Sequence, residues 1–289
     1  GLKAMAGLQM TQETHLVHMQ GGGHVDLHRY KPAKTEGLPV VVAHGTLSNQ
    51  LAVEHLGSFL AEQGFDTWLL EWGGHGHAKP AHRKQNFEYP ALNDLPAAID
   101  FIVQYTGFEQ LHWTSHSGGG LLALMLLARQ PQRLAQIKTL SLIGAQVTDA
   151  APNLKEKMRV AALGTLTRLF GRTPRKLVPI GPEGEPTLLL VQWCKWNLSG
   201  RWKGTDGFDY LEALKQINVP SLVIAGGRDE VAPTKGCRRI YEALGGPKTW
   251  HECTVKQGFS KDFSHSQMIR GEAAKTEVFP LLHRFIQAA

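Results

Sequence analysis

A short turn of small residues joins two apolar stretches near the middle of the chain, and this turn limits the possible folds more than any other feature. Residues 111–114 are typical of a buried strand, and residues 120–127 are typical of a buried helix. Between them lies the pentad Ser115-His116-Ser117-Gly118-Gly119. So sharp a turn drives its apical residue toward positive φ and requires small residues two positions before and after it. The pattern predicts that Ser117 is the apex, with its hydroxyl at the edge of a sheet.

A serine hydroxyl becomes a good nucleophile only when a base accepts its proton, and a histidine base needs an acid to orient it. Asp229 follows the apolar run 221–225, and His265 follows the strand-like run 248–255. Both therefore lie beyond predicted strand ends, where catalytic groups collect in open parallel sheets. We predict that Ser117, His265 and Asp229 form a catalytic triad.

The order of these residues, serine then aspartate then histidine, resembles the α/β-hydrolase family in its esterase and lipase branch. A second feature supports the resemblance, because the buried strand-like run 39–43 ends in His44-Gly45-Thr46. The family has a His-Gly turn after its third strand. The resemblance covers the chain from about Val17 to the C-terminus, apart from residues 148–210.

The resemblance implies that the backbone N–H groups of Thr46 and Gly118 form an oxyanion hole. It also implies a small-molecule carboxylic ester as the substrate, and neither a metal nor an organic cofactor. Three alternatives keep the same residues: a thioesterase or acyltransferase, a hydrolase of carbon–carbon bonds, and a ligand-binding receptor with slow turnover.

Two other aspartates compete for the role of the acid. Asp149 follows the strand-like run 139–144, the position of the acid in some members of the family. We favour Asp229, because its Gly-Gly-Arg-Asp-x-Val-x-Pro surroundings match the more common family loop. Asp262 is only three residues from His265, which is a poor position from which to orient the imidazole.

The chain has 14 histidines, and His44, His75 and His77 are the ones that could be imagined as a metal site. They lack a carboxylate or cysteine cluster at ligand spacing, so we expect no metal there. We expect His116 to lie beside the turn without a catalytic role.

Eight β-type runs exchange with helical patterns along the chain, which predicts a mostly parallel eight-stranded sheet flanked by helices. The first two runs, at 16–19 and 25–30, flank three glycines and predict an antiparallel hairpin. Residues 1–147 and 211–289 are the expected α/β-hydrolase core. Residues 148–210 form a segment that is too long for an ordinary connection between a strand and a helix, and we expect it to form an α-helical cap, or lid. We call it the 148–210 segment. Within it, Phe170, Trp193 and Trp196 are the candidate substrate-binding residues.

The net charge of +6 is concentrated between residues 155 and 176, where seven basic residues accompany one acidic residue. Such a stretch is compatible with peripheral contact to anionic lipid. Its basic residues are not interleaved with aromatic ones, so we expect no nucleic-acid partner. No apolar run approaches the ~20 residues of a membrane span. The chain has three cysteines, an odd number that argues against a disulfide framework and favours the cytoplasm as the location. A removed signal peptide is also compatible with the sequence.

Overall fold

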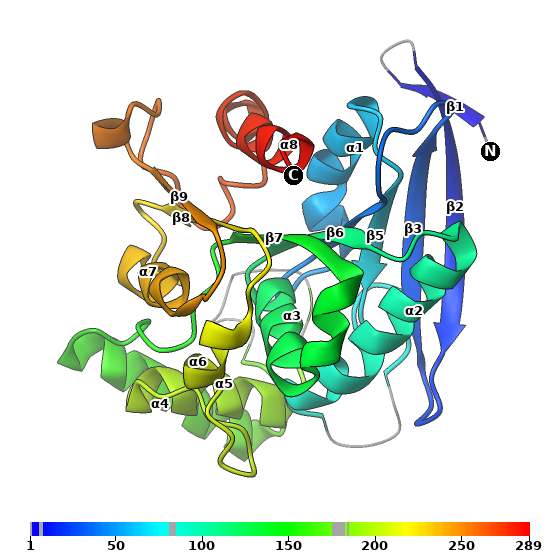
Figure 1. Cartoon of the computed structure of the whole chain (residues 1–289). Coiled ribbons are helices and arrows are strands. Elements are labelled where there is room, and N and C mark those ends of the chain that lie inside the picture. The colour runs from blue at the N-terminus through cyan, green and yellow to red at the C-terminus, as the bar shows by residue number, and fades with distance from the viewer. Residues whose placement is uncertain (1, 6–7, 81–84, 175–182, 184) are drawn as a thin grey trace.

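The computed structural model describes residues 2–5, 8–80, 85–174, 183 and 185–289, and a nine-stranded sheet lies at its centre (Figure 1). In sequence order the strands are β1 (Leu2–Met5), β2 (Leu8–His18), β3 (His24–Pro32), β4 (Val40–Ala43), β5 (Thr67–Glu71), β6 (Leu111–His116), β7 (Ile137–Ile143), β8 (Ser221–Gly226) and β9 (Lys248–Cys253).

The spatial order of the strands is β1-β2-β3-β5-β4-β6-β7-β8-β9. Neighbours from β5 to β9 run parallel, whereas β1, β2 and β3 pair antiparallel with one another and β3 pairs antiparallel with β5. The eight predicted strands are β2 to β9, and the mostly parallel α/β fold is confirmed. The predicted hairpin is the β2–β3 pair, in which Val17 lies opposite Val25. Strand β1 adds a ninth strand that the sequence analysis did not predict.

Helices cover both faces of the sheet (Figure 1). They are α1 (Glu54–Glu62), α2 (Leu95–Thr106), α3 (Gly118–Arg129), α4 (Leu154–Phe170), α5 (Thr187–Ser199), α6 (Tyr210–Ala213), α7 (Thr234–Ala243) and α8 (Phe279–Gln287). Short 3₁₀ or π turns are η1 (Gln50–Val53), η2 (Pro90–Asp94), η3 (Pro131–Gln136), η4 (Leu214–Gln216), η5 (Val255–Gln257) and η6 (Ala274–Val278). Within the described part of the chain, no helix has both the length and the apolar character that crossing a bilayer requires.

The alternation of side chains along the parallel strands divides the core into two clusters. In β4, Val41 and Ala43 pack with the cluster that contains α2, α3 and α7, whereas Val40 and Val42 pack with α1 and α8. Both faces of the strand are buried, which explains why its sequence is continuously apolar rather than alternating. The parallel strands end at one common edge, and the predicted site residues follow β4, β6, β8 and β9 there.

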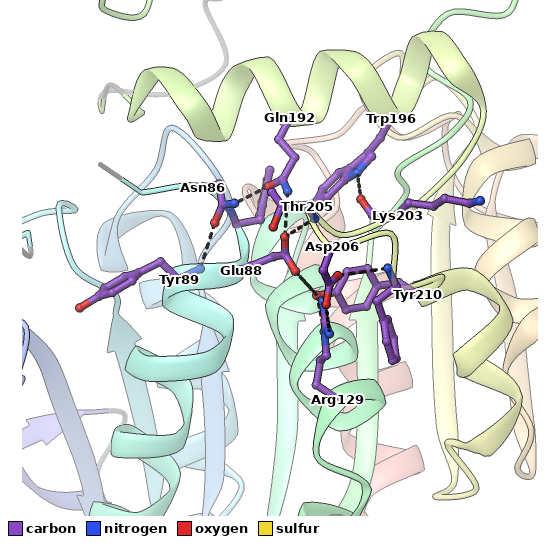
Figure 2. A network of polar contacts seen from close by, with 12 residues as sticks. Asn86, Glu88, Tyr89, Arg129, Gln192, Trp196, Lys203, Thr205, Asp206 and Tyr210 are labelled. Carbon is purple, nitrogen blue, oxygen red and sulfur yellow. Dashed lines mark hydrogen bonds and ion pairs between the residues drawn. The ribbon is translucent and has the colours of Figure 1, made fainter. Parts of the chain in front are cut away.

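Two helices of the 148–210 segment, α4 and α5, pack side by side (Figure 1). Residues 175–182 and 184 of this segment lie outside the described residues. A polar network joins the end of the segment to the core (Figure 2). Its centre is the carboxylate of Glu88, which accepts hydrogen bonds from Gln192, Thr205 and Tyr210. Arg129 contacts Glu88, Asp206 and Tyr210.

Candidate active site

Ser117 stands at the apex of the turn between β6 and α3, with φ 54° and ψ −123°. Positive φ is rare for residues other than glycine, and among the described residues that are not glycine only Leu47 shares it with Ser117. Small neighbours make this turn possible. A Cβ on Gly119 would lie 2.5 Å from the carbonyl oxygen of His44, and a Cβ on Gly45 would lie 2.8 Å from the Cβ of Ser117. The loops after β4 and β6 are therefore in direct contact at this serine.

Asp229 and His265 are brought together although 36 residues separate them. His265 Nδ1 lies 2.6 Å from Asp229 Oδ2, and both side chains are almost fully buried. The other carboxylate oxygen accepts hydrogen bonds from the N–H groups of Val231 and Ala232, at 2.9 and 2.8 Å. The carboxylate is thus held in place from both sides, and the bond at Nδ1 leaves Nε2 of His265 as the nitrogen available for proton transfer.

The two other aspartates have structural partners. Asp149 forms an ion pair with Arg239, with Oδ2 3.1 Å from Nε, and accepts a hydrogen bond from the hydroxyl of Thr148. Asp262 accepts a hydrogen bond from the N–H of Val255. Neither carboxylate pairs with His265 in the described part of the chain.

Ser117 and His265 face the same cavity of about 520 Å³ at the carboxyl edge of the sheet, together with Gly45, Thr46 and His116. Among the described residues, the hydroxyl of Ser117 makes no hydrogen bond to the ring of His265. Such bonds are often long in the absence of substrate and tighten when it binds.

His116 lies beside the turn, as expected, and it also contacts His265. Its ring lies 4.4 Å from the ring of His265 between centroids, and its Nε2–H donates to the carbonyl oxygen of His265 at 3.0 Å. Burial lowers the pKa of His116 well below its usual value, so the ring is neutral and remains a donor at this nitrogen. His116 therefore fixes the backbone that carries His265, which residue spacing alone could not indicate.

The two predicted oxyanion donors are neighbours. A Cβ on Gly118 would lie 3.1 Å from the backbone nitrogen of Thr46. Gly118 is the first residue of α3, so its N–H has no partner within the helix and carries the positive end of the helix dipole. This arrangement can stabilise a negatively charged oxygen beside Ser117.

The three aromatic residues proposed for the substrate occupy different places. Trp193 lines a narrow apolar cavity of about 50 Å³ with Leu47, Phe87 and Leu190, and this cavity shares Thr46 and Val231 with the cavity of Ser117. Trp196 is buried against Phe87 and Trp202 and borders a different cavity. Phe170 is 62% exposed. The structure brings Trp193 to the site and does not bring the other two there.

Potential metal ligands gather elsewhere. Among the described residues, the one group of three is Asp26, His28 and Glu71, whose ligand atoms lie within 4.8 Å of one another. His28 Nε2 is 2.7 Å from Glu71 Oε1, which is a hydrogen-bond distance. Two of the three histidines that the sequence suggested have other partners: His44 contacts the carbonyl of Gly45, and His75 pairs with Glu185.

Comparisons with known proteins identify relatives of the same fold. Residues 39–174 match the family described as the alpha/beta hydrolase fold. Human gastric triacylglycerol lipase is 30% identical over 150 residues, which are 46% of this chain and 38% of the lipase. This chain thus spans well under half of that relative's length.

Two solved structures show the same fold over nearly the whole chain. An esterase from Exiguobacterium antarcticum has a TM-score of 0.66 at 17% identity, covering 94% of this chain and 98% of the esterase. A thioesterase domain from the curacin biosynthetic pathway has a TM-score of 0.58 at 17% identity, covering 94% and 99%.

Proposed function

We propose that this chain, whose residues 39–174 match the alpha/beta hydrolase fold family, is a serine hydrolase that cleaves carboxylic esters through an acyl-enzyme. One observation carries the proposal: the hydrogen-bonded pair of Asp229 and His265 shares a cavity with Ser117, which sits on a strained turn. The esterase and lipase names among the similar proteins support the same reaction class.

Each residue has a defined role in the proposed reaction. His265 Nε2 accepts the proton of Ser117 as Oγ attacks the acyl carbon, and it later delivers this proton to the departing alcohol. Asp229 holds the tautomer that makes Nε2 the basic nitrogen and stabilises the imidazolium. The N–H groups of Thr46 and Gly118 stabilise the oxyanion, and removing one such donor typically slows kcat by roughly 10²–10³. Water then hydrolyses the acyl-enzyme by the same steps.

The test compares two aspartates in one assay. Asp229→Asn should lower kcat on a p-nitrophenyl ester by about 10⁴, because the histidine takes the wrong tautomer. Asp149→Asn is the matched control and should change kcat little. A fluorophosphonate probe should label wild-type protein at Ser117 and leave the Ser117→Ala variant unlabelled. Labelling at another serine, or equal losses for the two aspartates, would refute the triad.

The 148–210 segment is proposed as a cap that supplies the apolar part of the substrate site. The cavity lined by Trp193 and Leu190 adjoins Thr46, so it is suited to bury an acyl chain whose carbonyl faces Ser117. Each buried methylene contributes about 0.8 kcal/mol. Butyrate or longer esters should therefore be preferred over acetate by kcat/KM, and Trp193→Ala should reduce that preference. An unchanged profile in the variant would argue against this pocket.

A thioesterase is the second candidate, and one observation favours it. Two exposed arginines, Arg228 and Arg270, line the cavity of Ser117, and neither forms an ion pair with another described residue. Guanidinium groups bind phosphate well, and acyl thioesters of coenzyme A carry phosphates. Comparing kcat/KM for an acyl-CoA with that for the matching p-nitrophenyl ester decides between the two. A preference for the thioester that disappears in Arg228→Ala/Arg270→Ala would establish the second candidate.

The outer face of α4 is proposed to contact an anionic lipid surface. Exposed apolar residues spaced along one face of this helix form a stripe, Leu154, Met158, Ala162 and Leu169, with the polar Thr165 between the last two. Four exposed cations flank the stripe, Lys155 and Arg159 on one side and Lys157 and Arg168 on the other, against one acid, Glu156. The opposite face is the one that packs inward, through Val160 and Thr167. An exposed apolar stripe between two rows of cations is typical of interfacial helices.

Co-sedimentation with vesicles tests this contact. The protein should bind vesicles that contain phosphatidylglycerol and should not bind vesicles of phosphatidylcholine alone. Met158→Asp/Leu169→Asp should abolish binding, while Val255→Asp, at a similarly exposed residue of η5, should retain it. Equal binding by both variants would contradict the proposed face.

The proposed location is the cytoplasm. All three cysteines, Cys194, Cys237 and Cys253, are buried free thiols, which is compatible with a reducing compartment.

A further inference from the structure

Two glutamates of the 148–210 segment reach the loop that follows β4. The N–H of Leu47 donates to Glu185 Oε1 at 2.8 Å, and the N–H of Glu183 donates to the carbonyl oxygen of Leu47 at 3.0 Å. The carboxylate of Glu183 also accepts hydrogen bonds from Asn49 Nδ2 and from the N–H of Gly76, at 3.1 and 2.8 Å. Both backbone polar groups of Leu47 are thus bound by residues distant in the sequence.

The second partner of Glu185 is His75, in the loop after β5. His75 Nε2 contacts the same Oε1 that Leu47 uses, and the two side chains are 1% and 0% exposed. The other oxygen of this carboxylate, Oε2, is buried without a partner among the described residues. A buried, ionised carboxylate with one oxygen unpaired requires a nearby cation to offset the cost of burying its charge.

Both ring nitrogens of His75 face acceptors. Nε2 faces the carboxylate of Glu185, and Nδ1 lies 3.2 Å from the carbonyl oxygens of Trp72 and of Gly73. A neutral imidazole has only one N–H, so it would turn a lone pair toward either the carboxylate or the two carbonyls. The geometry therefore fits an imidazolium, with a proton on each nitrogen.

The surroundings of His75 support this state. Burial opposes the charge, but the pairing with Glu185 outweighs it and raises the pKa of His75. The neighbouring ring of His44, 5.0 Å away between centroids, is neutral because burial lowers its pKa well below the usual value. A second carboxyl, that of Asp94, also interacts electrostatically with His75, and burial raises the pKa of Asp94 to about 6. Glu185 is the carboxylate in direct contact with the His75 ring, so it is the partner that pairs with the imidazolium.

The loop that this pair holds is strained. Leu47 has φ 60°, a conformation in which a residue with a Cβ costs free energy and persists only where contacts enforce it. Thr46, the preceding residue, carries one of the two proposed oxyanion donors. Relaxation of Leu47 would rotate the peptide group next to this donor.

We propose that Glu185 and His75 are positioning residues, which hold Thr46 in the conformation that stabilises the oxyanion and do so only while His75 is protonated. This inference rests on the proposed ester hydrolysis. It adds that the 148–210 segment takes part in building the oxyanion hole as well as in lining the substrate site. Loss of the proton from His75 would weaken the hold on Leu47 and slow the reaction.

Glu185→Gln isolates the charge, because a carboxamide oxygen can still accept the N–H of Leu47 but cannot balance an imidazolium. We expect kcat at neutral pH to fall about tenfold, because the N–H of Thr46 is displaced from the oxyanion rather than removed. KM should change less than about twofold. In the wild type kcat should decline on the alkaline side, and in Glu185→Gln this decline should move to lower pH. Tyr210→Phe is the control, because it alters the other junction of the same segment and should leave the pH profile unchanged.

A role that is only structural would lower the unfolding temperature of Glu185→Gln and leave its kcat profile like that of the wild type. That result would overturn the inference, as would equal shifts in Glu185→Gln and Tyr210→Phe. A second measurement does not depend on variants. In ¹⁵N NMR spectra of the wild type at pH 7, both ring nitrogens of His75 should be protonated, and a neutral ring would overturn the inference.

The two proposals fail in different ways. A wild-type protein that hydrolyses no ester and takes up no fluorophosphonate refutes the proposed function and this inference with it. A wild-type esterase whose Glu185→Gln variant keeps the full kcat profile refutes the inference alone.

Discussion

Among the described residues, two buried carboxylates, Glu88 and Glu185, join the 148–210 segment to the core, and the two junctions differ in the cation that each one uses. At the first, Glu88 accepts hydrogen bonds from Tyr210 at 2.5 Å, Thr205 at 2.8 Å and Arg129 at 3.0 Å (Figure 2). At the second, Glu185 contacts His75 and the backbone of Leu47.

The difference lies in when each cation is charged. The guanidinium of Arg129 keeps its charge at every pH at which proteins remain folded, and it binds Asp206 with two nitrogens at the same time. The imidazole of His75 can lose its charge in the physiological range. The junction at Glu88 is therefore permanent, whereas the junction beside the proposed oxyanion hole is conditional on pH.

Removing the permanent cation should have the largest effect on stability. Arg129→Ala leaves Glu88, whose side chain is only 10% exposed, without its cation and should lower the free energy of unfolding by about 3 kcal/mol. Arg133→Ala is the matched control, because its partner Asp100 is 55% exposed and the pair should contribute less than about 1 kcal/mol. Urea unfolding at pH 7 measures both. Equal costs would show that the Glu88 junction is no more than a surface ion pair.

The conditional junction should appear in the pH dependence of stability. The pKa of His75 is raised in the folded protein, so its stabilising effect is complete below the unfolded value of about 6.5. It is lost as the pH rises through the folded pKa, by about 1.4 kcal/mol for each unit of the shift.

Urea unfolding between pH 6 and 9 should therefore show that the stability difference between wild type and His75→Gln shrinks as the pH rises. The difference between wild type and Arg129→Ala should stay constant over the same range. Parallel curves for all three proteins would remove the distinction between the junctions.

A smaller effect than that of Arg129→Ala is expected for the single uncharged hydroxyl at the permanent junction. Tyr210→Phe deletes the hydroxyl that donates to Glu88 but leaves the contacts of this carboxylate with Arg129 and Thr205. The free energy of unfolding should fall by about 1.5 kcal/mol, because the acceptor of this hydrogen bond is charged. A cost as large as that of Arg129→Ala would mean that the hydroxyl, rather than the cation, dominates the network.

The catalytic candidates could be predicted because each is tied to a local pattern. Ser117 needs only a strand, small neighbours and a helix, all within residues 111–127, and the backbone adopts the expected positive φ. Asp229 and His265 follow strand-like runs, and in a parallel sheet the ends of such runs meet at one edge whatever lies between them. Their 2.6 Å contact follows from that rule.

Other features depend on distances that no local pattern contains. Strand β1 has four residues and pairs only with β2, so nothing in its own sequence distinguishes it from a loop. Phe170, Trp193 and Trp196 have similar apolar character and lie in the same segment. Only the packing of α5 against the core turns Trp193 toward Thr46, while Phe170 at the end of α4 remains exposed.

The sequence by itself determined the fold class and the three residues proposed for the chemistry, because hydrophobic periodicity and small-residue turns act over short stretches of chain. The contact between His75 and Glu185 was decided by the tertiary structure alone. These residues are 110 positions apart, each lies in an irregular loop, and the charge of His75 arises only where burial and a carboxylate act on it together. Such a property belongs to an environment, and folding creates it.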